Sequence, residues 1–169
     1  REATGYGLVY FMEEYMRDCG LSFEGARAVI SGSGNVAIYA CEKAAQLGAT
    51  TVAMSDSGGW VYDPAGIDLD LMKAVKEVRR GRISEYAAQR PGAEYHTDGS
   101  IWDVPCDIAL PCATQNELLL PHAQTLIQNG VKAVGEGANM PTAPEAAHLF
   151  QQSGVLYAPG KASNAGGVA

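Results

Sequence analysis

The chain has 169 residues, of which 47% are hydrophobic and 18% are charged, so it is long enough to form one domain with its own core. Twelve Lys and Arg residues against 19 Asp and Glu residues give a formal net charge of -7, which disfavours nucleic acids and anionic membranes as partners. The longest unbroken apolar run, Val36 to Cys41, is far too short to span a membrane.

The first half of the chain alternates predicted helices with short runs rich in β-branched residues. Gly20 is expected to end the first helix, and Gly48 is expected to close the second in the same way. The predicted elements of this half are a helix over 4–19, a strand over 27–31, a helix over 35–47, a strand over 51–55, a helix over 68–80 and a short helix over 83–89.

The second half continues this alternation after residues 90–104, whose pattern is the weakest guide to a regular element. The predicted elements are strands over 107–110, 132–135 and 155–158 and helices over 121–128 and 143–152. Continuous apolar strands that alternate with helices predict a parallel sheet covered on both faces. We therefore expect an α/β fold with a doubly wound, mostly parallel sheet and helices on both faces, in a single domain.

The strongest local motif is the glycine loop Gly32-Ser33-Gly34-Asn35-Val36-Ala37, which follows a predicted strand and opens a predicted helix. Gly32 allows the tight turn, and Gly34 lacks a Cβ, so the backbone can approach a pyrophosphate. The helix N-terminus then offers free N–H groups and the positive end of the helix dipole to this anion. In this context the motif predicts a Rossmann-like dinucleotide site, although a glycine turn without a ligand reads the same way.

Two features after the second predicted strand give opposite indications about the cofactor. Asp56 is placed to accept hydrogen bonds from ribose hydroxyls, which favours a cofactor without a 2′-phosphate. A basic cluster would instead neutralise a 2′-phosphate, to which Ser57 is also placed to donate. The cluster consists of Lys73, Lys76, Arg79, Arg80 and Arg82. The alternative for Asp56 is an aspartate that only stabilises a turn, and the alternative for the basic cluster is an ordinary solvated helix face.

Five motifs follow one another along the chain: EATGYG at 2–7, SGSGNVA at 31–37, PCATQNE at 111–117, EGANMP at 136–141 and PGKASNAGGVA at 159–169. Together they resemble the cofactor-binding domain of the glutamate dehydrogenase family. The similarity is closest to the hexameric, NADP-type bacterial and fungal branch, because residues 55–57 and 76–82 match that branch. The resemblance covers residues 1–169 as one dinucleotide-binding domain.

The resemblance implies roles for individual residues. It implies cofactor contacts for Thr4, Gly32, Ser33, Gly34, Asn35, Val36, Asp56, Ser57, Lys76, Arg79, Arg82, Ala113, Thr114, Gln115, Asn116 and Asn139. It implies that Asn164 and Val168 lie toward the bound substrate. Simpler roles stay open for four of these residues: helix caps at Thr4 and Asn116, a loop support at Asn139 and a left-handed turn at Asn164.

The resemblance also implies the reversible deamination of L-glutamate to 2-oxoglutarate and ammonia, with hydride transfer to NADP, or to NAD as the alternative. In this family a catalytic lysine and aspartate belong to a separate N-terminal domain, so no catalytic residue is expected in this chain. Because the chain begins with Arg1, we expect a fragment that lacks that domain and the C-terminal helices and is inactive alone. We expect a homo-hexamer for the full-length enzyme and leave open a monomeric fragment.

Other readings of the chain remain alongside this one. They are a related leucine, valine or phenylalanine dehydrogenase, a non-catalytic dinucleotide-binding module, and a methyltransferase, which also places a glycine loop after its first strand. No His and Cys residues have the spacing of a zinc site, so no metal is expected. Without a signal peptide or a Cys-x-x-Cys pair, we expect a cytoplasmic protein.

Overall fold

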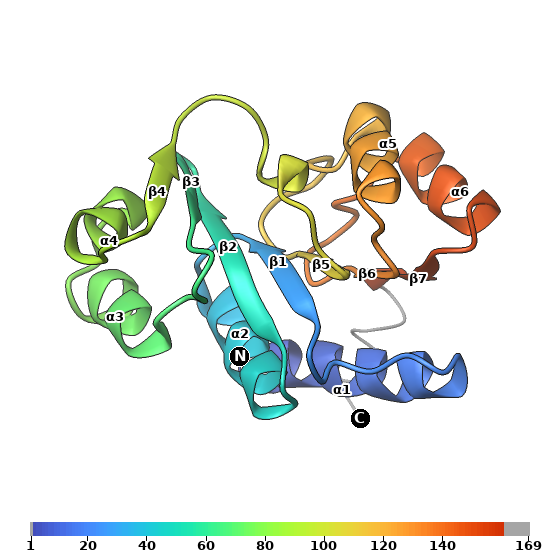
Figure 1. Cartoon of the computed structure of the whole chain (residues 1–169), viewed down its shortest axis with the longest axis horizontal. Coiled ribbons are helices and arrows are strands. Elements are labelled where there is room, and N and C mark those ends of the chain that lie inside the picture. Colours follow the sequence, from blue (N-terminus) through green and yellow to red (C-terminus); the bar gives the residue numbers. More distant parts are fainter. Residues whose placement is uncertain (1, 161–169) are drawn as a thin grey trace.

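A seven-stranded sheet forms the centre of the fold, with helices on both of its faces (Figure 1). The computed structural model describes residues 2–160, and it describes their side chains from Gly5 onward. The strands are β1 (Arg27–Ser31), β2 (Thr50–Asp56), β3 (Gly59–Tyr62), β4 (Glu94–His96), β5 (Ile108–Pro111), β6 (Ala133–Gly135) and β7 (Leu156–Ala158). The helices are α1 (Glu2–Asp18), α2 (Asn35–Gln46), α3 (Leu69–Lys73), α4 (Ile83–Gln89), α5 (Leu120–Gln128) and α6 (Pro144–Gln152).

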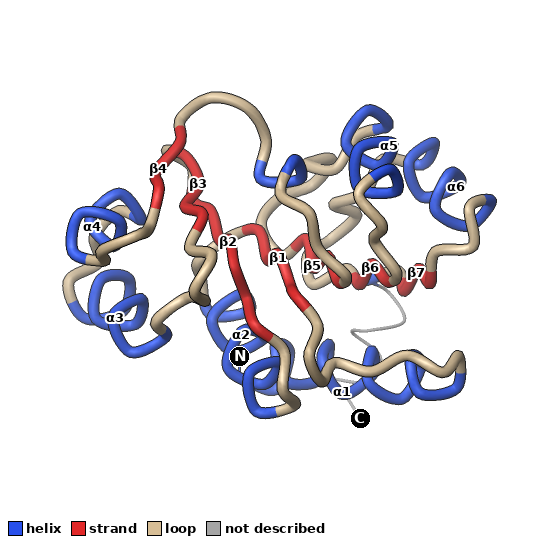
Figure 2. Tube along the Cα trace, in the orientation of Figure 1, coloured by secondary structure: helices blue, strands red, loops and turns tan. Residues whose placement is uncertain are grey.

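The strand order in the sheet is β4-β3-β2-β1-β5-β6-β7. Five neighbouring strands, β2, β1, β5, β6 and β7, are parallel to one another. At one side of the sheet, β3 pairs antiparallel with both β2 and β4. Helices α1 to α4 lie on one face of the sheet, and α5 and α6 lie on the other (Figures 1 and 2). These findings confirm the predicted doubly wound α/β fold.

The side chains of β1 show why both faces need a cover. Ala28 and Ile30 pack into the core under α1 and α2, while Val29 between them packs into the opposite core under α5 and α6. All three are fully buried, because successive side chains of a strand point to opposite faces. Among the described residues, no helix combines the length and the apolar character that a membrane span requires.

The predicted helix over 68–80 is wrong in its second half. After α3 the chain forms a π-helical turn at Ala74–Val78, and Arg79 N–H donates to the Ala74 carbonyl at 3.1 Å. The wider turn admits one extra residue, so a search for a 3.6-residue period does not find it. Strands β3 and β4 were also not predicted. They are short, and β3 starts at a glycine directly after the turn that ends β2.

The arrangement of β1 and β5 determines where a ligand would bind. They are neighbours in the sheet, with Ser31 paired to Pro111 at their carboxyl ends. The helices that follow them, α2 and α5, cover opposite faces of the sheet. The two connecting loops therefore diverge, and in open α/β sheets ligands bind in the crevice that such a divergence leaves.

Candidate functional site

The glycine loop between β1 and α2 is held against both neighbouring strands. Gly32 N–H donates to Ser55 Oγ at 2.8 Å, which ties the loop to the end of β2. On the other side, Gly32 has a φ of +88°, and a Cβ there would lie 3.1 Å from the Cys112 carbonyl oxygen. Only glycine combines this backbone conformation with so close an approach. Ser33 in the same loop is buried.

The N-terminus of α2 is suited to an anion. Gly34 is the N-cap residue, no described side chain caps this end, and the first turn, which contains Asn35 and Val36, carries no acidic residue. A Cβ on Gly34 would meet no described atom within 4 Å, so the space in front of these N–H groups is open. Free N–H groups, a positive dipole end and open space together fit the pyrophosphate of a dinucleotide.

The Asp56 carboxylate at the end of β2 faces into the protein. Its Oδ1 accepts hydrogen bonds from Gly58 N–H at 2.9 Å and Gly59 N–H at 3.2 Å. Its Oδ2 accepts from Ile83 N–H at 2.7 Å and lies 3.4 Å from Lys76 Nζ. Partial burial raises the pKa of this carboxyl, but the hydrogen bonds from Ile83 and Gly58 and the charge of Lys76 outweigh it, so the pKa is lowered. Since its side chain is only 7% exposed, Asp56 offers little surface to a ribose.

Two members of the basic cluster converge beside this carboxylate. Lys76 comes from the π-helical turn, and Arg82 precedes α4 as its N-cap residue. Arg82 Nη1 donates to Ser57 Oγ at 2.6 Å, one residue after Asp56. Lys76, Arg82 and Ser57 thus bring two cations and a hydroxyl to the end of β2. This is a fitting environment for a phosphate on the adenosine ribose.

Other members of the cluster point elsewhere. Arg79 Nη2 lies 3.4 Å from Gln89 Oε1, on α4. Lys73 Nζ pairs with Glu42 Oε1 of α2 at 2.5 Å, a hydrogen bond that lowers the pKa of Glu42 and raises the pKa of Lys73. The structure therefore brings Lys76 and Arg82 to the site and leaves Arg79 apart from it.

The loop after β5 carries Ala113, Thr114, Gln115 and Asn116, all of them exposed. Its shape depends on Glu117, whose Oε2 accepts hydrogen bonds from Ala113 N–H at 2.9 Å and Thr114 N–H at 3.0 Å. Burial raises the pKa of the Glu117 carboxyl. The carboxylate thus acts from behind the loop, and the loop residues remain accessible to a ligand.

The loop after β6, which carries Asn139, is joined to the loop after β5. Asn116 N–H donates to the Met140 carbonyl at 3.1 Å, and Leu118 N–H donates to the Pro141 carbonyl at 3.0 Å. Asn139 is exposed and lines a cavity of about 550 Å³ at the ends of β6 and β7. Asn116 has a φ of 54° and does not cap α5, whose N-cap residue is Leu119.

Sequence reasoning missed two acidic residues that shape these loops, Glu117 and Glu136. Glu136 is buried after β6, where its Oε1 accepts from Gly160 N–H at 2.7 Å and its Oε2 accepts from the Tyr157 hydroxyl at 2.6 Å. Burial, followed by this hydrogen bond, raises the pKa of Tyr157. In the sequence, each of these glutamates lies in the segment that follows an apolar strand. A carboxylate buried there must accept hydrogen bonds from nearby loops, and this requirement could have identified both residues.

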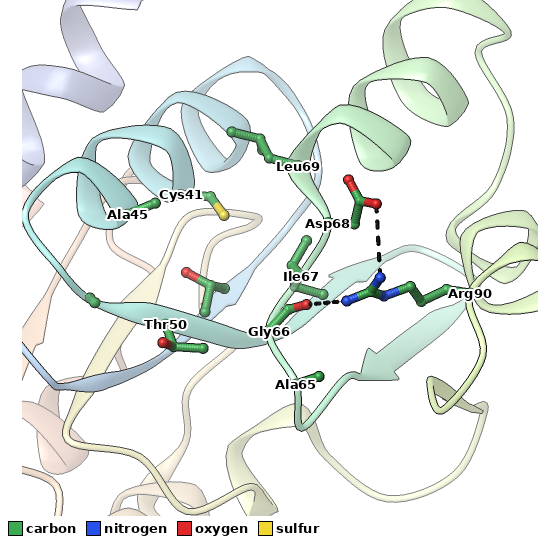
Figure 3. A pocket seen from close by; sticks show the side chains of 11 residues that line it. Cys41, Ala45, Thr50, Ala65, Gly66, Ile67, Asp68, Leu69 and Arg90 are labelled. Carbon is green, nitrogen blue, oxygen red and sulfur yellow. Dashed lines mark hydrogen bonds and ion pairs between the residues drawn. The ribbon is translucent and has the colours of Figure 1, made fainter.

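A separate cavity of about 400 Å³ lies at the opposite end of β2 (Figure 3). It is lined by α2, by Thr50 and Thr51, and by residues 65–69. Its cation, Arg90, is paired: Nε donates to Asp63 Oδ2 at 2.9 Å, and Nη2 donates to the Gly66 carbonyl at 3.1 Å. This cavity lies away from the carboxyl ends of the strands, where the predicted site residues gather.

Three predicted site residues cannot be placed. Asn164 and Val168 lie outside the described residues, and the side chain of Thr4, near the start of α1, is also outside them. The other predicted residues lie in the glycine loop, at or beside the end of β2, and in the loops after β5 and β6. Apart from Arg79, they line the carboxyl edge of the parallel strands.

Comparisons with known proteins agree with this geometry. The family model for glutamate/leucine/phenylalanine/valine dehydrogenases matches residues 1–169. The NADP-specific glutamate dehydrogenase of Escherichia coli (strain K12) is 56% identical over 171 residues, which cover 99% of this chain and 38% of that protein. The NAD(P)-specific glutamate dehydrogenase of Xylanibacter ruminicola is 55% identical, with the same coverage.

A solved structure extends the agreement to the fold. The glutamate dehydrogenase of Plasmodium falciparum superposes with a TM-score of 0.94 at 46% identity, over 99% of this chain and 36% of that one. The chain therefore spans less than two fifths of the length of these relatives. Sequence motifs, fold and the full-length match of the family model lead to one conclusion: the chain belongs to the glutamate/leucine/phenylalanine/valine dehydrogenase family.

Proposed function

We propose that residues 1–169 are the cofactor-binding domain of an NADP-dependent glutamate dehydrogenase. The reaction is the reversible deamination of L-glutamate to 2-oxoglutarate and ammonia. The observation that carries the choice of cofactor is the convergence of Lys76 and Arg82 on the Asp56–Ser57 turn. The choice of substrate is supported by the names of the relatives and by the motifs at 111–117 and 136–141.

We assign three parts of a dinucleotide to the carboxyl edge. The N–H groups of α2 would hold the pyrophosphate, and Lys76, Arg82 and Ser57 would hold the 2′-phosphate. Residues 113–116 and Asn139 would line the nicotinamide side. The bound nicotinamide supplies the hydride chemistry at the substrate Cα, while this chain binds and orients it. The groups that move protons belong to the N-terminal substrate domain, outside residues 1–169.

The balance between NADP and NAD follows from the orientation of Asp56. A carboxylate directed at the ribose would repel a 2′-phosphate, but this one is occupied by three N–H groups and Lys76. Each hydrogen bond that involves a charged group contributes about 1.5–3 kcal/mol, so two cations outweigh one shielded carboxylate. NADP is therefore the proposed cofactor, and NAD is the alternative that the test must separate from it.

Further proposals concern the whole enzyme. We propose a cytoplasmic homo-hexamer that acts on small molecules and binds neither nucleic acid nor membrane. The net charge of -7 supports the last point, since a polyanion would be repelled. Related amino-acid dehydrogenases share the family, and their substrate preference would be set by the domain outside this chain.

The test is a calorimetric titration of the purified protein with NADP+ and with NAD+ at fixed ionic strength. We expect tighter binding of NADP+, and we expect Lys76→Ala and Arg82→Ala each to weaken NADP+ about tenfold, as the loss of one contact to a phosphate should. Arg17→Ala, an exposed cation on α1, is the control for net charge. Equal or tighter binding of NAD+, unaffected by Lys76→Ala and Arg82→Ala, would contradict the assignment of NADP.

A further inference from the structure

The proposed phosphate-binding cations come from a short stretch of unusual backbone. Lys76 lies in the π-helical turn, and Arg82 follows only six positions later. Between them, Arg80 has a φ of 53°, and Gly81 N–H donates to the Val75 carbonyl at 2.7 Å. The chain thus folds back on itself before Arg82. Neither a regular helix nor an extended strand would bring both cations to one point.

Two carboxylates, those of Asp56 and Glu85, hold the backbone at the start of α4. Asp56 Oδ2 accepts a hydrogen bond from Ile83 N–H at 2.7 Å, which ties the start of α4 to the end of β2. Glu85 Oε2 accepts from Arg82 N–H at 2.9 Å, while Glu85 N–H donates to the Arg82 carbonyl at 2.9 Å. Arg82 is therefore held through both its N–H and its carbonyl, and its guanidinium is directed at Ser57.

Gly81 leaves room for the Glu85 carboxylate. A Cβ on Gly81 would overlap Glu85 Oε2 and would lie 2.6 Å from its Cδ. Any other residue at position 81 would force the Glu85 carboxylate to move from the place where it accepts from Arg82 N–H. Gly81 and Glu85 therefore form one unit, in which the missing side chain of the first makes room for the carboxylate of the second.

We propose that Gly81 and Glu85 are positioning residues that determine cofactor specificity by holding Arg82 in place for the 2′-phosphate. The inference rests on the proposed function and extends it to two residues that touch no part of the cofactor themselves. Glu85 is an exposed carboxylate close to a phosphate-binding group, yet its removal weakens phosphate binding.

The experiment separates position from charge by measuring NADP+ and NAD+ affinity by calorimetry on the full-length protein. We expect Glu85→Ala to weaken NADP+ binding about tenfold and to change NAD+ binding by less than about twofold. Glu85→Gln removes the charge but retains an oxygen that accepts from Arg82 N–H, so it should stay within about twofold of the wild type for both cofactors. Glu77→Ala, an exposed glutamate of the π-helical turn, is the matched charge control.

Gly81→Ala tests the unit from its other side. It should reproduce the effect of Glu85→Ala, and the double variant should be no weaker than either single variant, because both disrupt the same hydrogen bond. Retained NAD+ binding reports that each variant is folded. If Gly81→Ala does not fold, the two Glu85 variants still decide the question.

Several outcomes would overturn the inference. If Glu85→Ala and Glu85→Gln both tighten NADP+ binding, Glu85 acts as a repelling charge only. If Glu85→Ala changes nothing, Arg82 does not depend on it. Lys76→Ala and Arg82→Ala in the same series separate the failure of this inference from the failure of the proposed site. If they too leave the preference for NADP+ unchanged, Lys76 and Arg82 are not the phosphate-binding cations and the proposed site is wrong, whereas if only they reduce it, this inference alone fails.

Discussion

Asp56 makes contacts in the structure that its position after a strand does not predict. In the sequence it is the candidate reader of a ribose, but in the structure it accepts hydrogen bonds from the backbone N–H groups of Gly58, Gly59 and Ile83 and pairs with Lys76. It therefore links β2, the turn after it, the π-helical turn and α4. A single carboxylate with four donors around it stabilises the loop geometry on which the proposed phosphate site depends.

This role predicts a pH-dependent effect of Asp56→Asn on stability. Because the pKa of Asp56 is lowered in the folded chain, its ionised form stabilises the fold above about pH 4, the ordinary pKa of an aspartate, and this contribution disappears as the pH falls through the lower, folded-state pKa. We expect Asp56→Asn to reduce the free energy of unfolding by about 1–3 kcal/mol at pH 7. The difference from the wild type should shrink below about pH 4.

Urea unfolding of both proteins between pH 7 and pH 3 measures this difference. Asp98→Asn, which changes an exposed carboxyl in the loop after β4, serves as the control and should have little effect at any pH. A difference for Asp56→Asn that stays constant down to pH 3 would show that the charge of Asp56 does not stabilise the fold.

At the scale of elements, α2 both packs into the core and presents its N-terminal N–H groups at the proposed site. Its buried residues, among them Ile38, Ala40 and Ala44, pack into the core on one face of the sheet. Its N-terminus has no capping side chain among the described residues, and a Cβ on Gly34 would meet no described atom within 4 Å. Packing of the buried residues thus stabilises the helix even though its first N–H groups have no capping side chain.

Gly34→Ala should separate the contribution of α2 to stability from its proposed contribution to cofactor binding. Gly34 has a φ of -80° and a ψ of -168°, an extended conformation that alanine also adopts, and a Cβ would meet no described atom within 4 Å. We expect a loss of stability no greater than about 1 kcal/mol, in line with the poor N-cap preference of alanine. Because the methyl group would occupy the space proposed for the pyrophosphate, binding of NADP+ and NAD+ should weaken equally, by about tenfold or more.

Calorimetry with both cofactors and thermal unfolding together check this prediction. An equal loss for both cofactors distinguishes a pyrophosphate contact from the 2′-phosphate contacts, which only NADP+ makes. Unchanged affinity for both would place the pyrophosphate away from the N-terminus of α2.

At the scale of the whole molecule, the described residues form one sheet with a core on each face and no division into separate units. The proposed cofactor-binding residues lie at the carboxyl edge of that sheet. The chain also spans only 38% of the Escherichia coli relative, so the groups that complete a dehydrogenase site would come from elsewhere in the enzyme. The domain is therefore expected to separate cofactor binding from catalysis.

This separation is testable on residues 1–169 alone. We expect a cooperative unfolding transition and measurable binding of NADP+, but no glutamate-dependent formation of NADPH, because the chain lacks the proposed proton-transferring groups. A spectrophotometric assay with saturating L-glutamate measures the rate, and the full-length protein is the positive control. A glutamate-dependent rate from residues 1–169 would place catalytic groups within this chain.

The sequence predicted the parallel strands well because their signal is local. Four of the five residues of β1 are buried, and the glycine loop that follows has its own conformational requirements. The antiparallel strands β3 and β4 and the π-helical turn carried no such signal. The strands are short, β4 pairs with a strand distant in sequence, and the wider hydrogen bonding of the π-helical turn departs from the 3.6-residue period. Glu136 was not recognised as a support of its loop because its partners, Tyr157 and Gly160, are distant in sequence. Glu85 and Glu117 bind nearby backbone N–H groups, but the direction in which these side chains turn depends on the folded loop.

The order of apolar runs, glycine turns and family motifs along the chain determined the doubly wound fold, the location of the dinucleotide loop and the family. The fold and the loop follow from residue type and spacing, and the family follows from the resemblance of the five motifs. The tertiary structure alone decided which way Asp56 faces and which members of the basic cluster meet at the end of β2. The direction of a side chain depends on the partners that folding brings to it. Asp56 accepts a hydrogen bond from Ile83 of α4, 27 positions away, and Arg82 donates to Ser57, 25 positions away.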